Sequence, residues 1–218
     1  MTVLALSGCS KEVQENKESE VALVVANLGG TNLYIPRPYL DAPNTGIDPK
    51  SILLQAWYPG DGLMPSDARA RWRRLGWSKN VRILIHWDVP HSSIKAWTAA
   101  AIKLQQATKA EGSEFGLLHM TQPSGAMQDH FEIWIEGSEA EPMSMISCAD
   151  KQVARSPQCI HYFNIGAYEI QAHYDARLLP EWKTIQTHIS HLFKSFNSSD
   201  TASAYFAEHS SNNLGDKK

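Results

Sequence analysis

The stretch AYEIQAHYDARLLPEWKTIQTHISHLFKSF (Ala167–Phe196) contains the two patterns that decide the fold. In its first part, up to Tyr174, apolar and polar residues alternate, which predicts a β-strand with one covered face. After Pro180 the apolar residues recur every three or four positions, which predicts an amphipathic helix with the proline in its first turn. The apolar positions of this helix are Trp182, Ile185, Ile189, Leu192, Phe193 and Phe196. A strand followed closely by a long helix, each with a face to bury, indicates a fold that combines α and β structure.

Further segments upstream show the strand pattern, with turn residues between them, and predict one antiparallel sheet covered on one face. In His130–Glu136 the alternation predicts an inward face of Phe131, Ile133 and Ile135 and an outward face of Glu132, Trp134 and Glu136. The other expected strands are Val21–Leu28, Asn32–Ile35, Ser51–Tyr58, Val81–Trp87, Phe115–Met120, Met143–Cys148 and Cys159–Asn164.

Two more helices are expected between the early strands. One starts at Ser92 or Ser93 and runs through Ala107, and a shorter one covers Ala68–Leu75. We therefore expect an α+β fold in a single domain, residues 21–196: an antiparallel β-sheet with the long C-terminal helix and the mid-chain helix packed on it. Residues 197–218 are mostly polar, which predicts a mobile polar tail.

The first residues, MTVLALSGCS, form a short apolar run that ends in Leu6-Ser7-Gly8-Cys9. This tetrad resembles the lipobox of bacterial lipoproteins, in which the cysteine is acylated and becomes the first residue of the mature protein. The resemblance implies a truncated lipoprotein signal over residues 1–9, lipidation of Cys9 and a flexible tether over residues 10–20. Ser10 resembles the sorting signal for the outer membrane. Because no Lys or Arg precedes Cys9 and the apolar run is short, an accidental match is the alternative.

The chain has three cysteines, and two remain when Cys9 is set aside. Cys148 and Cys159 each border a strand-like segment, with turn residues between them. This arrangement favours a disulfide that joins two neighbouring strands, as is common outside the cytoplasm. Metal ligands or two free buried thiols are the alternatives, although no Cys-x-x-Cys spacing supports metal.

Nine histidines are the main candidates for a metal or hydrolase site. His188 and His191 share a helix face, and His86 and His91 flank Asp88, but neither pair belongs to a His-Glu-x-x-His arrangement. The sequence also has no glycine-rich phosphate loop and no Gly-x-Ser-x-Gly elbow. We therefore expect no enzymatic activity, no metal and no cofactor. The net charge of −3 argues against non-specific nucleic-acid binding.

Two charged stretches are candidates for binding a partner. The basic, aromatic stretch comprises Arg69, Arg71, Trp72, Arg73, Arg74 and Trp77. The acidic stretch comprises Glu132, Glu136, Glu139 and Glu141. Arginine and tryptophan often anchor protein interfaces, which favours recognition of a protein by the first stretch. A solvated face without a partner is the alternative for each.

Three groups of residues carry a resemblance that spans most of the chain. The first is Tyr34-Ile-Pro36 with Tyr39-Leu40, and the second is Leu54–Pro59 with Pro65. The third consists of Cys148, Cys159, Tyr174, Leu178-Leu179, Glu181-Trp182-Lys183 and the helix to Phe196. Together they resemble a group of Gram-negative envelope lipoproteins that are encoded beside type VI secretion phospholipase and lipase effectors. Those lipoproteins resemble immunity proteins, which block the toxins in the periplasm.

The resemblance implies a lipid-anchored periplasmic protein, held at the outer membrane, that binds and neutralises a cognate phospholipase or lipase effector. The membrane contact would then be through the lipid anchor alone, because no apolar run is long enough to span a bilayer. A structural or assembly lipoprotein of the envelope is the first alternative. An enzyme with a dispersed site, in which His86 or Asp88 takes part, is the second.

Overall fold

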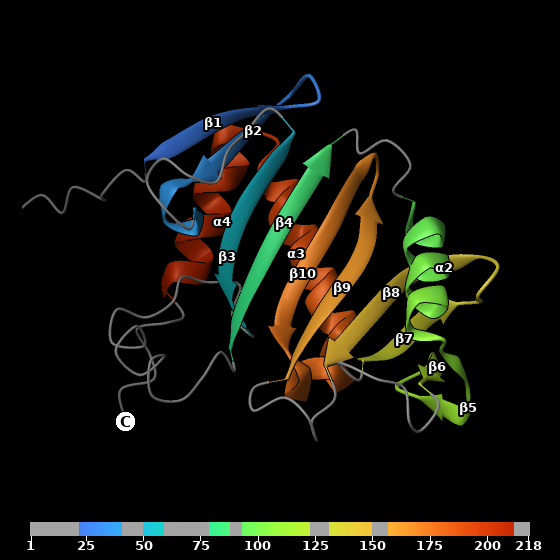
Figure 1. Cartoon of the computed structure of the whole chain (residues 1–218). Coiled ribbons are helices and arrows are strands. Elements are labelled where there is room, and N and C mark those ends of the chain that lie inside the picture. The colour runs from blue at the N-terminus through green and yellow to red at the C-terminus, as the bar shows by residue number, and fades with distance from the viewer. Residues whose placement is uncertain are drawn as a thin grey trace, which may run out of the picture.

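The computed structural model describes residues 22–40, 50–58, 79–87, 93–122, 131–149 and 157–211. Its main element is an eight-stranded antiparallel sheet in the order β3-β4-β10-β9-β8-β7-β6-β5 (Figure 1). The strands are β3 (Ser51–Trp57), β4 (Asn80–Trp87), β5 (Thr108–Glu114), β6 (Leu117–Thr121), β7 (Phe131–Gly137), β8 (Pro142–Ala149), β9 (Gln158–Ile165) and β10 (Tyr168–Asp175). Together with the helices described next, this sheet confirms the predicted α+β class.

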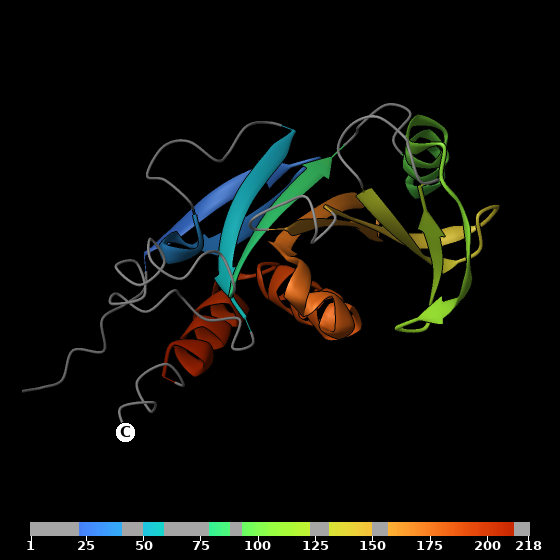
Figure 2. The same cartoon turned by 60° about the horizontal axis from the view of Figure 1, so that its bottom comes forward.

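Helices lie on opposite faces of the sheet (Figure 2). The short 3-10 helix η2 (Ala176–Glu181) leads from β10 into α3 (Trp182–Ser195), the helix predicted from the apolar spacing. The side chains of α3 that face the sheet are buried together with apolar residues of β3, β4, β9 and β10. On the other face α2 (Ile94–Gln105) packs against β7, β8 and β9. Both predicted helix–sheet contacts are therefore present.

Coverage from both sides contradicts the expectation of a sheet covered on one face. In β7, Ile133 and Ile135 pack under α2, while Trp134 belongs to the core under α3 and is only 3% exposed. The predicted outward orientation of Trp134 is therefore wrong. The error arises because alternation identifies the more apolar face of a strand, but does not exclude a second cover over the other face.

A second, two-stranded sheet corrects the expectation of a single sheet. β1 (Leu23–Leu28) and β2 (Thr31–Pro36) form a hairpin, followed by the 3-10 helix η1 (Arg37–Tyr39). Gly29 in its two-residue turn has a φ of +62°, and a Cβ atom there would overlap the ring of Trp87. A glycine at this position therefore provides both the turn and the close contact with β4.

The C-terminal residues also differ from the expected mobile tail, because Ser199–Ser211 form the helix α4. Its side chains Ala202 and Phe206 are buried, and the Phe206 ring lies edge-on to Tyr39 at 5.9 Å. These two residues are one helical turn apart and pack near β2. Few apolar residues are needed for this contact, so the polar composition of the segment concealed it.

The strand β5 was not predicted at all. The sequence pattern extended the mid-chain helix through Ala107, whereas α2 ends at Gln105, and Gln106 adopts a left-handed conformation with a φ of 50°. The chain then enters β5, a polar strand at the edge of the sheet with almost no buried side chain. Such a strand has no apolar alternation from which it could be recognised. The short helix predicted over Ala68–Leu75 lies outside the described residues.

The predicted disulfide between Cys148 and Cys159 is present. The two residues lie directly opposite each other in the paired strands β8 and β9, and both are buried. The disulfide therefore cross-links the two central strands β8 and β9 at the end where the chain passes from one to the other. Its main stabilising effect is expected to come from restricting the unfolded chain.

We expect the double variant Cys148→Ala/Cys159→Ala to lose about 2–3 kcal/mol of unfolding free energy in oxidising buffer, because its unfolded chain is no longer cross-linked. Urea unfolding monitored by circular dichroism measures this loss. The wild-type protein in reductant should lose a similar amount. Equal midpoints for the wild-type protein with and without reductant would contradict a stabilising disulfide.

His161 lies fully buried between the sheet and α3. The rings of Phe163, Tyr174 and Trp182 surround it at centroid distances of 4.9, 6.2 and 5.9 Å. Neither of its ring nitrogens has a hydrogen-bond partner among the described residues. Burial, together with the positive charge of Lys183, lowers the pKa of His161 from 6.5 to about 3. The imidazole is therefore neutral in the folded protein at neutral pH.

Because the pKa of His161 is lower in the folded than in the unfolded chain, acid favours unfolding. Its contribution to stability is complete above pH 6.5 and is lost as the pH falls towards 3. Between pH 7 and pH 4.5 the loss from this group is about 2–3 kcal/mol. We expect His161→Leu, which removes the titrating group, to reduce the pH dependence of unfolding by this amount. Urea unfolding at several pH values measures it.

The exposed His191 on α3 provides the matched control for this experiment. His191→Leu should leave the pH dependence of the unfolding free energy close to that of the wild-type protein. Parallel pH profiles for His161→Leu and the wild-type protein would contradict the role assigned to His161.

Candidate interaction surface

The described residues offer no cluster that could serve as a metal centre. They contain no group of three or more His, Cys, Asp or Glu residues that could hold a metal ion. The hollow found between β3, β4 and α3 is small and lined almost entirely by apolar side chains. No described helix is both long enough and apolar enough to cross a membrane.

Part of the predicted site lies outside the described residues. This applies to the lipidation residue Cys9 and to the whole basic, aromatic stretch. That stretch comprises Arg69, Arg71, Trp72, Arg73, Arg74 and Trp77. These residues remain predictions from the sequence.

The four predicted acidic residues do not form one patch. Glu136 is paired with Lys183 and accepts a hydrogen bond from the Ser144 hydroxyl at 3.0 Å. Glu132 lies at the other end of β7, with its carboxylate 3.8 Å from His119. Glu139 and Glu141 are exposed in the turn between β7 and β8. The turn residues are therefore the better candidates for contact with a partner, because Glu136 serves to join α3 to the sheet.

The helix α2 presents an outer face that the sequence analysis did not identify as a site. Ser93 caps its start by accepting a hydrogen bond from the Ala96 N–H at 3.1 Å. Ile94, Thr98 and Ile102 face the sheet. The exposed positions of the helix hold small residues, two lysines and two large apolar side chains. These exposed residues are Lys95, Ala96, Trp97, Ala99, Ala100, Lys103 and Leu104.

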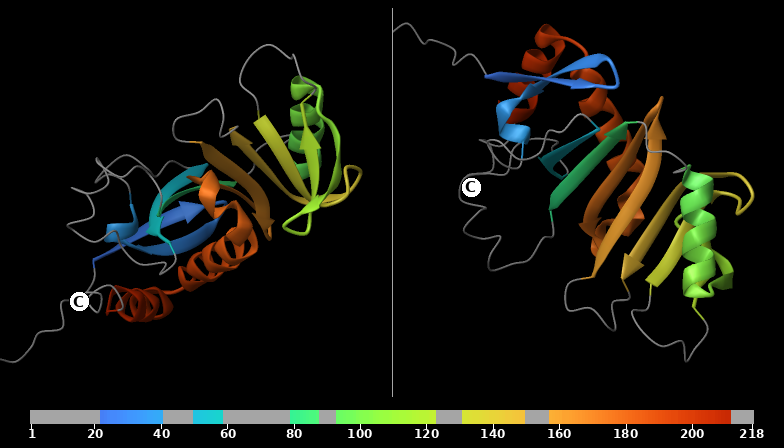
Figure 3. Two further views of the ribbon diagram at one scale, coloured as in Figure 1. Left: turned by 90° about the horizontal axis from the view of Figure 1, so that it is seen from below. Right: turned by 45° about the horizontal axis from the view of Figure 1, so that its top comes forward.

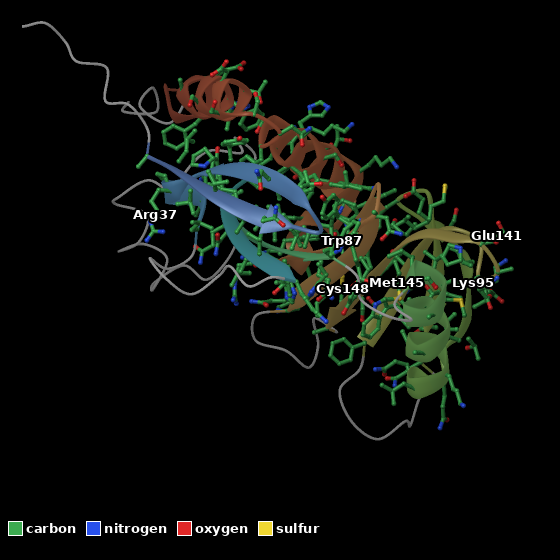
Figure 4. All side chains as sticks on the ribbon, turned by 90° about the horizontal axis from the view of Figure 1, so that it is seen from above. Arg37, Trp87, Lys95, Glu141, Met145 and Cys148 are labelled. Atoms are coloured by element: carbon green, nitrogen blue, oxygen red, sulfur yellow. A yellow bond between two sulfur atoms is a disulfide. The ribbon has the colours of Figure 1, made fainter. Side chains whose placement is uncertain are left out.

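Three exposed apolar side chains lie on α2 and on β8, one of the strands that α2 packs against. Trp97 is 38% exposed, Leu104 is 80% exposed, and Met143 at the start of β8 is 63% exposed. We define the α2 surface as these three residues with Lys95, Lys103, Glu139 and Glu141. Figure 4 shows Lys95 of α2 and Glu141 of the β7–β8 turn at the same end of the molecule. Exposed apolar residues rimmed by charges are typical of a protein-binding surface.

Hydrogen bonds hold Trp97 in place at the margin of α2. Its indole N–H donates to Glu169 at 3.1 Å, and its ring stacks on Tyr162 at a centroid distance of 5.6 Å. Glu169 is 6% exposed, and its second oxygen accepts a hydrogen bond from the Gln171 amide at 3.1 Å. This network joins α2 to β9 and β10. An anchored aromatic side chain loses little conformational entropy on binding, which favours its use in recognition.

Burial and neighbouring charges shift the pKa values of two side chains beside this network. Burial, and then the negative charge of Glu169, raises the pKa of the Tyr162 hydroxyl. Burial, and then the positive charge of Arg82, lowers the pKa of His173 on the same face of the sheet. Both side chains are therefore neutral at pH 7. These two groups therefore add no charge beside Glu169.

Comparisons with known proteins establish the fold. No protein-family model and no curated protein matches the chain. The chain is similar in structure to Smlt3025, an immunity protein of the Stenotrophomonas maltophilia type IV secretion system. The TM-score is 0.59 at 16% identity, over 78% of this chain and 90% of Smlt3025.

It is also similar to FrpD, the iron-regulated outer membrane lipoprotein of Neisseria meningitidis. Here the TM-score is 0.52 at 16% identity, over 80% of this chain and 92% of FrpD. At this identity both likenesses show a shared fold. They therefore support the predicted architecture and leave the binding partner to be argued from this chain.

The Trp97–Glu169 hydrogen bond can be tested separately from any partner. We expect Trp97→Phe to lower the unfolding free energy by about 1–3 kcal/mol, because the largely buried carboxylate loses a donor. Combining it with Glu169→Gln should cost less than the sum of the single changes, since a neutral amide needs the donor less. Urea unfolding of the four proteins measures the coupling. Additive changes would contradict it.

Proposed function

We propose that this protein is an immunity-type protein that binds a secreted toxin and neutralises it by covering its active region. The observation that carries this proposal is the α2 surface, where apolar side chains are displayed on a helix fixed to a sheet. The fold shared with an immunity protein of a secretion system supports it. Neutralisation by binding requires no catalytic group in the inhibitor, in agreement with the expectation that the chain is not an enzyme.

The toxin in this proposal is a phospholipase or lipase effector of the type VI secretion system. This choice is supported by the sequence resemblance carried by Tyr34-Ile-Pro36, Leu54–Pro59 and the segment around Glu181-Trp182. The immunity protein with the shared fold belongs to a type IV system, so the fold by itself does not select the secretion system. The choice of a lipid-hydrolysing toxin therefore depends on the sequence resemblance.

The place of action in this proposal is the periplasm, with the chain anchored to the outer membrane through a lipid on Cys9. The Leu6-Ser7-Gly8-Cys9 tetrad and the polar residues after it support this location. The fold shared with an outer membrane lipoprotein agrees with it. A disulfide between Cys148 and Cys159 is also expected to persist in an oxidising compartment.

On the α2 surface, Trp97 and Leu104 would act as the apolar anchors. A partner that covers them removes apolar area from water, while Lys95, Lys103, Glu139 and Glu141 fix its orientation through charge. Few residues usually supply most of the binding energy, and tryptophan is prominent among them. The effect of single substitutions should therefore be concentrated at these anchors.

The variant Leu104→Glu tests the surface directly, because a side chain that is 80% exposed can be replaced without disturbing the core. We expect its affinity for the phospholipase or lipase encoded beside the gene to fall at least about ten-fold, which is the cost of burying an unpaired carboxylate at an apolar contact. Isothermal titration calorimetry measures the affinity. A parallel assay of lipid hydrolysis measures neutralisation.

Val25→Thr is the matched control, since Val25 is an exposed apolar residue at the other end of the molecule. It should bind the toxin with wild-type affinity.

The triple variant Arg71→Ala/Trp72→Ala/Arg74→Ala tests the basic, aromatic stretch predicted from sequence. Wild-type affinity of Leu104→Glu would exclude the α2 surface, and failure of the wild-type protein to bind any neighbouring effector would exclude the immunity function.

A structural or assembly lipoprotein of the envelope is the second candidate function, favoured by the fold shared with FrpD. The two candidates differ in the effect of deleting the gene. Deletion should sensitise cells to the neighbouring effector if the protein confers immunity. Altered envelope integrity with unchanged sensitivity to the toxin would favour the second candidate.

A further inference from the structure

The outer edge of β1 is a row of backbone groups without a partner in the described residues. Across the β1–β2 hairpin Val25 lies opposite Tyr34, but the Tyr34 N–H donates to the Phe196 carbonyl at 2.8 Å, on the other side of β2. Val25 and Tyr34 therefore form a non-hydrogen-bonded pair, in which the N–H and C=O groups of Val25 point away from β2.

The same alternation fixes the direction of the neighbouring groups. The Arg37 N–H donates to the Ala22 carbonyl at 2.9 Å, so the hydrogen-bonded pairs involve every second residue from position 22. Leu23, Val25 and Asn27 consequently direct their N–H and C=O groups outward. No described residue provides a backbone partner for these groups.

The other edges of the sheets differ from β1, and the outer edge of β3 is bridged at Leu54 by Leu40. The outer edge of β2 is occupied by Phe196 and lies beside α4. The edge strand β5 contains Lys109, Glu111 and Glu114, an irregularity in its pairing and Gly112 with a φ of +90°. Charges and bulges are the features that prevent edge strands from pairing with other chains. β1 (LVVANL) has no charge, no proline and no irregularity in its register.

We infer that β1 pairs antiparallel with β1 of a second copy of this chain, with Val25 opposite Val25. In this register Leu23 lies opposite Asn27 of the other copy, so all outward backbone groups find partners. The register is compatible with a two-fold axis, because each residue pair is repeated by symmetry. Val25, which is 57% exposed, then meets its own copy at the centre.

The observations favour a second copy over a foreign strand. The strand is uncharged, so two copies meet without like-charge repulsion, and Val24 lies opposite Ala26 on the face that continues the core. A pair of six-residue strands is well below the ~1,200 Å² of a typical stable interface, so the dimer should be weak and concentration-dependent. Figure 3 shows β1 and α2 at opposite ends of the molecule. The dimer therefore does not depend on the proposed toxin binding.

Cysteine cross-linking of the full chain tests the register, with Cys9 replaced by serine to remove its thiol. Val25→Cys should give a disulfide-linked dimer under mild oxidation, because opposite residues in a strand pair lie within disulfide reach. Asn27→Cys should give at least about ten-fold less dimer, since the two copies of residue 27 are roughly 13 Å apart along the strands. A mixture of Leu23→Cys and Asn27→Cys proteins should cross-link, although neither does so alone. Equal yields for residues 25 and 27 would overturn the register.

Amide hydrogen exchange of the unmodified chain tests the edge without any substitution. Protection of the Val25 N–H should increase with protein concentration, while protection of Val24 and Ala26, which bond to β2, should not. Full protection of Val25 at low concentration would overturn the inference, because another part of the same chain would then cover the edge. Protection of Val25 that appears only when the toxin is added would instead identify a foreign strand, and would overturn it as well.

Discussion

Eight antiparallel strands expose two faces, and the need to cover both of them determines how the remaining elements are placed. The long helix α3 covers the face that contains Ile83, Ile146 and Ala172, and most aromatic residues around it are buried. The disulfide between Cys148 and Cys159 holds together two of the strands beneath this helix. One consequence is that His161, in the same layer, is removed from water and finds no hydrogen-bond partner in the described part of the chain. The packing that stabilises the fold at neutral pH therefore also makes it sensitive to acid.

The opposite face is covered differently, and this difference creates the α2 surface. α2 needs few side chains to cover β7 and β8, so its remaining positions contain small residues and two exposed apolar ones. The helix is held by its N-cap at Ser93 and by the Trp97–Glu169 hydrogen bond. A rigid element with an apolar outer face requires little reorganisation before it binds. The surface proposed for recognition thus lies on a helix that buries few of its own side chains.

The sequence predicted those features whose signal is local. Apolar spacing identified α3, alternation identified most strands, and the positions of Cys148 and Cys159 beside two strands predicted the disulfide. Features that depend on distant partners were missed. Trp134 is buried because α3 lies over a face that its neighbours in sequence suggested was solvent-exposed. Phe206 is buried against Tyr39, a partner that lies more than 160 positions away in the chain and that the local sequence therefore cannot indicate. The α2 surface was also missed, because exposure of Leu104 depends on which side of the helix the sheet occupies.

The two proposed contact sites, the α2 surface and the outer edge of β1, lie far enough apart for both to be occupied at once. The α2 surface lies beside β7 and β8, whereas the outer edge of β1, which no described strand pairs, lies beyond β3 at the other end (Figure 3). Strands in a sheet are about 4.8 Å apart, so the strands between these two sites separate them by roughly 25–30 Å. A partner bound at α2 therefore need not displace a second copy bound at β1. If both contacts form, each dimer presents two α2 surfaces, one on each copy. Under the two proposals together, one dimer would bind two toxin molecules without any change in either surface.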